Sequence, residues 1–340
     1  MKYRSAVATP SIPMESAPAQ VVNRPWLHLL LFVLTVGTTS LTFDNLFLGA
    51  SLPWSARLSE ALTFSVALLT ILGAHEMGHY LLARVHGVDA SLPYFIPLPY
   101  LGVGTLGAVI RIRGRIPTRN ALVDIGAAGP LAGLLVALPF LLWGLAHSPV
   151  VDVPEVSSSF PGRTSLWSLG GDFLRWLQVK LSLAPASPAS DFVPQHALLI
   201  FGDGLLMKGL KWLVLGPLPA GKGLQEHPVV IAGWFGLLVT LLNLVPVGQF
   251  DGGHLAYALW GKHARWVGKA MALVLLFLTV FYTVTWGPWL LVATRVVGFG
   301  HPEVTRPAEP LGLGRKLVCA VCFLALAGCA MPVPIRMEIW

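Results

Sequence analysis

The sequence predicts an all-α integral membrane protein with about six transmembrane helices. Of its 340 residues, 55% are hydrophobic and only 11% are charged, whereas about 25% are charged in an ordinary soluble domain. The mean hydropathy is +0.70, and apolar runs of about 20 residues, the length that a spanning helix needs, recur along the chain. The net charge of +7 does not indicate a nucleic-acid partner, because the basic residues form short clusters between apolar runs, as they do in cytoplasmic loops.

The predicted spans extend from near the N-terminus to near the C-terminus. They are residues 26–43, 61–83, 121–146, 229–248, 268–294 and 317–334. The residues before them, 1–25, are polar and rich in Pro, Ala and Ser, and we expect a disordered cytoplasmic tail there. No internal repeat is found.

Basic residues between the spans predict the orientation. Arg111, Arg113, Arg115 and Arg119 precede the third span, and Lys262, His263, Arg265 and Lys269 follow the fourth. Cytoplasmic loops carry an excess of Lys and Arg, so both clusters and the N-terminus are expected in the cytoplasm. The loop 147–228 is then outside; it also carries basic residues, but long loops follow this rule poorly.

Two apolar segments do not fit a spanning helix. Residues 195–215 are interrupted by charged side chains, and we expect a helix on the membrane surface rather than a seventh span. Residues 91–110 are uncharged but contain three prolines and three glycines, which favour turns. Irregular backbone is tolerated at membrane depth only when it is buried in protein or lines a wet cavity. A re-entrant or interfacial loop beside the second span is therefore expected.

The second span contains His75-Glu76-Met77-Gly78-His79, which is an H-E-x-x-H pattern. Positions i and i+4 share a helix face, so the two imidazoles can bind one zinc ion, and the glutamate can act as general base on zinc-activated water. Between Leu62 and Leu82 the other ionisable group is the Tyr80 phenol. Ionisable groups within a span are costly and usually functional; the alternative is a buried polar cluster that joins helices.

A catalytic zinc usually takes three protein ligands and keeps one position open. The candidates for the third ligand are Asp124, Asp203 and Asp251, with His254 in reserve. The predicted orientation favours Asp251, because it follows the fourth span and lies at the same cytoplasmic depth as the two histidines. Pro and Gly residues around Asp251 free the backbone to turn its carboxylate toward a neighbouring helix.

Three motifs in this order resemble the site-2 protease family of intramembrane zinc metalloproteases. They are HEMGH at 75–79, AAGPLAG at 127–133 and NLVPVGQFDGG at 243–253. The resemblance extends over about residues 60–265. It implies peptide-bond hydrolysis within or beside the membrane, with one zinc ion per chain.

The resemblance also implies roles for individual residues. His75, His79 and Asp251 correspond to the zinc ligands, Glu76 to the catalytic glutamate, and Asn243 to a polar residue that helps to hold the substrate or the oxyanion. The glycines of the 127–133 motif are expected to allow close helix packing.

The same resemblance predicts a membrane-associated β-like segment, residues 91–113, after the zinc helix. An unwound substrate would add to it as a strand. The expected partner is a single-span membrane protein in the lipid bilayer, and the expected location is a bacterial inner membrane with the active site toward the cytoplasm. The stretch 147–195 is too short for a PDZ domain, so a PDZ-less member is expected.

The predicted organisation is a tail (1–25), a first span with an outer loop (26–60), the catalytic core (61–265) and the C-terminal helices (266–340). Two other functions remain possible on the residues alone. A metal transporter could pass an ion along the same ligands, although transporters often contain repeats. A non-catalytic scaffold could bind membrane clients, although it would have no need of Glu76.

Overall fold

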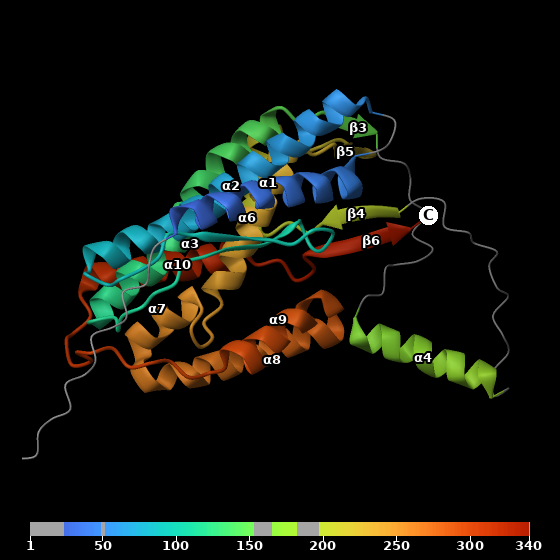
Figure 1. The fold of residues 1–340 in the computed structure, drawn as a ribbon. Helices are drawn as coiled ribbons and strands as arrows, with labels where there is room; N and C mark the ends of the chain where they lie inside the picture. Colours follow the sequence, from blue (N-terminus) through green and yellow to red (C-terminus); the bar gives the residue numbers. More distant parts are fainter. Residues whose placement is uncertain (1–23, 49–51, 153–164, 182–196, 340) are drawn as a thin grey trace, which may run out of the picture.

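The computed structural model describes residues 24–48, 52–152, 165–181 and 197–339. The predicted tail therefore lies outside the described residues except at its last two positions. Each predicted span contains a helix. These helices are α1 (Pro25–Phe47), α2 (Trp54–Val85), α3 (Arg119–Ala146), α6 (Pro228–Leu244), α8 (Ala264–Phe281) and α10 (Leu313–Cys329). Most of the described chain is helical (Figure 1).

Among the described residues, four helical segments are long and apolar enough to cross a membrane: α1, α2, α3 and a segment from Asp251 to Phe281 that joins α7 (Asp251–Trp260) to α8. Helices α6 and α10 have 17 residues each. At about 1.5 Å per residue they extend about 26 Å, slightly less than the hydrocarbon core of about 30 Å. The chain is a multi-pass membrane protein.

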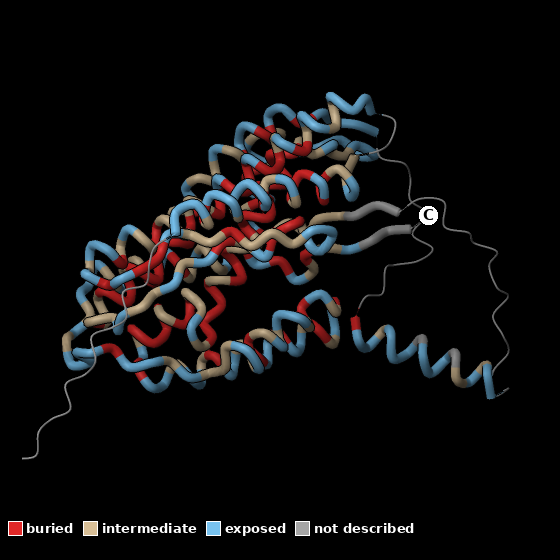
Figure 2. Tube along the Cα trace, viewed as in Figure 1, coloured by how far each residue is buried: buried red, intermediate tan, exposed pale blue. Residues whose placement is uncertain are grey.

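The centre of the molecule is the packing of α2, α3 and α6. Nearly every residue of α6 is buried, including Trp234, and Figure 2 shows buried residues concentrated where these helices meet. Gly78 of α2 lies against the Ala128 carbonyl of α3, where no Cβ would fit. Large apolar side chains such as Val66 and Leu135 are exposed on the outer faces of α2 and α3. Apolar outer faces are what a lipid environment requires.

A β-hairpin follows α2. Its strands β1 (Tyr94–Pro97) and β2 (Thr105–Val109) are antiparallel, with Tyr94 opposite Val109. An isolated bridge between Ala90 and Ile112 continues the pairing. Strands therefore occur within residues 91–113, where a β-like segment is expected; the depth of this segment in the membrane stays a prediction.

Helix α1 covers the β1 side of the hairpin. His28 Nδ1 lies 3.0 Å from the Pro93 carbonyl oxygen, and the Phe32 and Phe95 rings meet edge to face at 5.1 Å. These contacts occupy the β1 side of the hairpin, and among the described residues the β2 edge has no further strand beside it.

The structure differs from the sequence prediction in three regions: residues 195–215, the outer loop that contains β3 and β5, and residues 268–294. Residues 195–215 do not form a single helix: strand β4 (Ala197–Phe201) precedes helix α5 (Leu205–Leu215). Strand β4 pairs with β6 (Ile335–Ile339) at the other end of the chain, and this distant partner makes the segment extended. The short strands β3 (Val150–Asp152) and β5 (Lys222–Leu224) also pair, so the outer region is not purely helical. Helix α4 (Leu166–Lys180) contacts α8.

The predicted span 268–294 is also not one helix. Helix α8 ends at Phe281, and a 3₁₀ turn (Val284–Trp286), α9 (Gly287–Leu291) and a π-helix (Val292–Val297) follow. Pro288 lies in the first turn of α9. Proline is tolerated in a first helical turn, because its missing N–H would have no partner within the helix there.

Candidate metal centre and active site

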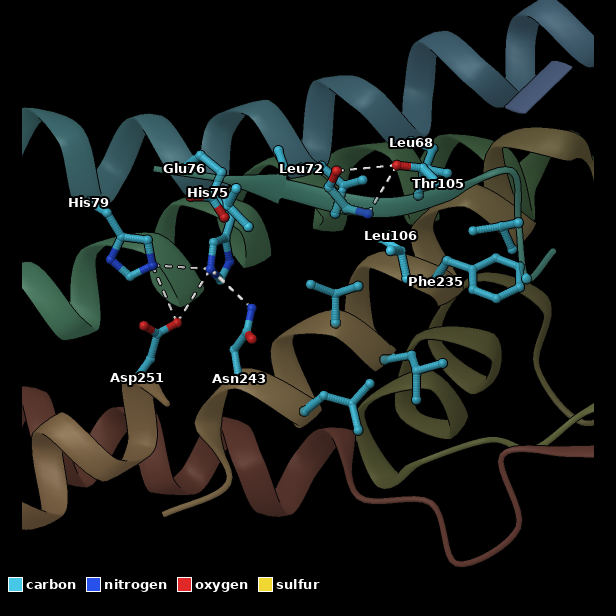
Figure 3. A pocket seen from close by; sticks show the side chains of 18 of the residues that line it. Leu68, Leu72, His75, Glu76, His79, Thr105, Leu106, Phe235, Asn243 and Asp251 are labelled. Atoms are coloured by element: carbon cyan, nitrogen blue, oxygen red, sulfur yellow. Dashed lines mark hydrogen bonds and ion pairs between the residues drawn. The ribbon is translucent and has the colours of Figure 1, made fainter. Parts of the chain in front are cut away.

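His75 and His79 lie one turn apart on α2, and both side chains are buried. Their Nε2 atoms are 3.1 Å apart. Figure 3 shows both rings pointing from α2 into the same space, toward Asp251. The i, i+4 spacing therefore places two imidazole nitrogens at one point, as the sequence predicts.

Asp251 is the first residue of α7 and completes this group. Its Oδ2 is 3.3 Å from Nε2 of His75 and 3.3 Å from Nε2 of His79. Gly252 lies so close to the Leu244 carbonyl that no Cβ would fit. The chain can therefore fold back tightly after α6 and carry the carboxylate to α2.

These three side chains offer ligand atoms that all lie within 4.8 Å of one another. Among the described residues, no other group of three or more His, Cys, Asp or Glu side chains lies close enough together to hold a metal ion. Two imidazoles and one carboxylate form a donor set typical of catalytic zinc. The residues present fit zinc and leave room for a further ligand from the cavity beside them.

Main-chain and glycine contacts from α3 orient the His79 ring. His79 Nδ1 lies 2.7 Å from the Ile125 carbonyl oxygen. A carbonyl can only accept, so Nδ1 carries the proton and the lone pair of Nε2 points toward Asp251. Gly129 faces the same ring, and a Cβ there would overlap its Nε2; a Cβ at Gly133 would make a tight contact of 3.2 Å with the Cβ of His75. The 127–133 motif thus packs closely, as expected, and the surface on which it packs is the pair of histidines.

Glu76 and Asn243 approach the same point from two helices. Asn243 Nδ2 is 3.2 Å from His75 Nε2. Glu76 Oε2 accepts a hydrogen bond of 3.0 Å from the Ile110 N–H, just beyond β2. Both residues line the cavity that contains the metal-ligand candidates.

This cavity has a volume of about 690 Å³. The three metal-ligand candidates, Glu76 and Asn243 gather at one part of it, and β2 and α6 form much of the remaining wall (Figure 3). The wall is mostly apolar; its side chains include Leu68, Leu72, Leu106, Phe235, Leu238 and Trp289. An extended peptide with apolar side chains is a suitable occupant of such a space.

The other candidates for the third ligand are engaged elsewhere. Asp124 pairs with His86 at 2.9 Å and with Arg315 at 2.8 Å, and Asp203 pairs with Lys211. His254 lines the cavity, but its Nδ1 is 2.7 Å from Nε2 of His301.

Two main-chain groups contribute to the site in a way that the sequence does not predict. They are the Ile125 carbonyl, which orients His79, and the Ile110 N–H, which binds Glu76. Every residue has both groups, so only the tertiary structure shows which ones are used. Gly129, in contrast, could be identified from the sequence, because it belongs to the AAGPLAG motif.

The chain is similar to plant proteins that share this region. It is 30% identical over 222 residues to "Probable zinc metalloprotease EGY2, chloroplastic" of Oryza sativa subsp. indica, covering 65% of this chain and 32% of the relative. Its identity to "Probable zinc metalloprotease EGY1, chloroplastic" of Arabidopsis thaliana is 29% over 280 residues, 80% of this chain and 43% of the relative. The chain thus spans about a third to two fifths of the length of these relatives. No solved structure matches the chain significantly.

A family model covers the part of the chain that builds the site. The model for "Peptidase family M50" matches residues 63–284. This match includes α2 with both histidines, the glycines of α3, and the turn from α6 into α7 that carries Asp251. The chain belongs to peptidase family M50.

Proposed function

We propose that this protein is a zinc metalloprotease that hydrolyses peptide bonds within or beside the transmembrane segment of single-span membrane proteins. The observation that carries this proposal is the convergence of His75, His79 and Asp251, with Glu76 beside them, on one cavity among apolar helices. A structural polar cluster would not need an accessible space of this size. The names of the relatives support zinc as the metal and proteolysis as the activity.

His75, His79 and Asp251 would hold the zinc. Bound zinc supplies a Lewis acid that polarises the scissile carbonyl and makes water more acidic. Glu76 takes a proton from the attacking water and later returns it to the leaving amine nitrogen. The Asn243 amide can donate to the oxygen on which negative charge develops.

The hairpin supports an extended substrate. A helical segment hides its carbonyls in hydrogen bonds between residues i and i−4, so it must unwind before cleavage. The edge of β2 lies along the cavity beside Glu76, and a substrate strand added there would gain main-chain hydrogen bonds while its side chains enter the apolar walls. We place this hairpin within the membrane as a re-entrant segment.

We further propose that six helices cross the membrane, with α6 and α10 as the two short spans. Mismatches of a few ångströms are accommodated by local thinning of the bilayer. The basic loops after the hairpin and after α7 support a topology with the N-terminus and the metal centre on the cytoplasmic side. The bacterial inner membrane stays a prediction; the names of the relatives place those proteins in chloroplasts.

The test is cleavage of a single-span reporter by the purified protein in lipid vesicles. We expect cleavage by the wild-type protein, its loss in Glu76→Gln, and its loss after chelation with recovery on adding zinc. Zinc binding without cleavage of any single-span reporter would favour a client-binding scaffold. Zinc transport across the vesicle membrane without cleavage would favour a transporter.

A further inference from the structure

One hydrogen bond links the expected general base to the strand beside the active site. Glu76 Oε2 accepts it from the Ile110 N–H at 3.0 Å. Glu76 comes from α2, and Ile110 directly follows β2. Both residues line the cavity that contains His75, His79 and Asp251. The bond therefore lies where a substrate would be placed.

The Ile110 N–H belongs to the free edge of the hairpin. The next residue, Arg111, uses both main-chain groups on the other edge: its carbonyl accepts from the Ser91 N–H at 3.0 Å, and its N–H donates to Ser91 Oγ at 2.9 Å. Consecutive residues of an antiparallel strand direct their main-chain groups to opposite edges. Ile110 therefore directs its N–H away from the β1 side and toward the cavity.

The opposite edge of the hairpin is already occupied. Helix α1 covers β1 through the contacts of His28 and Phe32, and Thr38 Oγ1 donates to the Gly104 carbonyl at the hairpin turn at 2.8 Å. A peptide that pairs with this hairpin must use the β2 edge. The ladder on that edge extends from β2 through Ile110, where Glu76 occupies the N–H.

We propose that an incoming substrate strand takes over the Ile110 N–H and thereby releases Glu76 for catalysis. This inference rests on the proposed proteolytic function and gives Ile110 a positioning role in it. An N–H is a single donor, so a substrate carbonyl that pairs in register with Ile110 displaces the Glu76 carboxylate. Without such a strand, the carboxylate stays held against the hairpin.

Because the same N–H binds either Glu76 or the substrate, Glu76 becomes available as a base only when the substrate strand pairs in register. Once released, Glu76 takes a proton from water, and the hydroxyl adds to the scissile carbonyl carbon. Glu76 then gives that proton to the amine nitrogen as the C–N bond breaks, so one water is consumed for each bond cleaved. A peptide too short to reach Ile110 meets a restrained base and is cleaved slowly even when it binds.

The experiment removes this one N–H and keeps every side chain. Ile110 is replaced by α-hydroxyisoleucine, which converts the amide into an ester and keeps the side chain. The matched control replaces Leu98 with α-hydroxyleucine, because the Leu98 N–H also donates within the hairpin, to the Gly104 carbonyl at 3.0 Å, but Leu98 is not part of the cavity wall. Values of kcat and KM are measured for a long single-span reporter and for peptides shortened stepwise from each end around the same cleavage site.

We expect wild-type kcat to fall about tenfold when the peptide becomes too short to pair with Ile110, the order expected for one hydrogen bond to a charged group. The Ile110 ester should abolish this fall by raising kcat on the short peptides. The Leu98 ester should keep it. An Ile110 ester that lowers kcat equally on long and short substrates would show that the N–H orients the base for reaction, and would overturn the proposal.

An unchanged length dependence in the Ile110 ester would overturn it as well. The proposed function is tested separately in the same assay, by zinc- and Glu76-dependent cleavage of the long reporter in the wild-type protein. Either result against the Ile110 proposal leaves that cleavage in place, so the two failures are distinguishable.

Discussion

Gly129 lies directly against the imidazole ring of His79, in a position where a Cβ would overlap Nε2. This nitrogen is also the atom that approaches Asp251 Oδ2 at 3.3 Å. The glycine on α3 thus sets how far the ring can turn, while the Ile125 carbonyl fixes its other nitrogen. The close packing of α2 on α3 therefore also determines the orientation of a proposed zinc ligand.

Substitution of this glycine should impair metal binding. We expect Gly129→Ala to displace the His79 ring and to weaken zinc affinity on the order of 10- to 100-fold, as the loss of groups that orient metal ligands does. Zinc titration of the detergent-solubilised protein measures this effect. Gly37→Ala on α1 is the matched control, because no atom lies within 4 Å of its added Cβ. Equal zinc affinity in both variants would contradict this account.

The identity of the third ligand is testable by metal content. We expect about one zinc per wild-type chain and its loss in His79→Ala and in Asp251→Ala. Asp124→Ala should retain zinc, because Asp124 pairs with His86 and Arg315 instead. Retention of zinc in Asp251→Ala, with loss in His254→Ala, would transfer the third position to His254.

Asn243 should affect the reaction more than the metal. Its amide nitrogen is 3.2 Å from His75 Nε2, within reach of a carbonyl oxygen held at the site. We expect Asn243→Ala to keep its zinc and to lower kcat by about 10²- to 10³-fold, as the loss of one oxyanion donor does. Steady-state kinetics on a single-span reporter, with zinc content measured on the same samples, is the check. A raised KM with unchanged kcat would show that Asn243 only binds substrate.

A partly buried ion cluster should stabilise the region between β4 and α6. Lys211 Nζ lies 3.1 Å from Asp203 and 3.0 Å from Glu226, with 25% of its side chain exposed. We expect Lys211→Met to cost about 1–3 kcal/mol, since it leaves two carboxylates without their cation and water relieves part of the penalty. The apparent unfolding temperature should fall, while Lys208→Met, at an exposed position of the same helix, should leave it nearly unchanged.

The same cluster has a defined pH dependence. Burial disfavours the charged form of Lys211, but Glu226 and Asp203 outweigh this and raise its pKa above the ordinary value. A raised pKa in the folded protein means that the stabilisation is complete below the pKa of an unfolded lysine, about 10.4, and declines as the pH rises through the folded-state pKa. The difference in unfolding temperature between wild type and Lys211→Met should therefore be constant around neutral pH. A difference that shrinks on going from about pH 6 to about pH 8 would contradict this assignment.

Much of the helical architecture could be predicted because the bilayer imposes it. Long apolar runs must form helices to satisfy their own main chain, and helices occupy all six expected regions. The break after Phe281 is less predictable from hydropathy, because the sequence remains apolar on both sides of it. The pairing of β4 with β6 could not be predicted, since each strand is defined by a partner more than a hundred residues away.

The sequence by itself determined the spacing of His75, Glu76 and His79, because a helix of fixed period places positions i and i+4 on one face. It also placed Asp251 after a helix and among turn-forming residues. Only the tertiary structure decided that this carboxylate, and not Asp124 or Asp203, meets the two imidazoles, and that the Ile125 carbonyl and the Ile110 N–H complete the surroundings. The physical reason is that a main-chain group has the same chemistry at every residue, so its role is set by which segments the fold brings together.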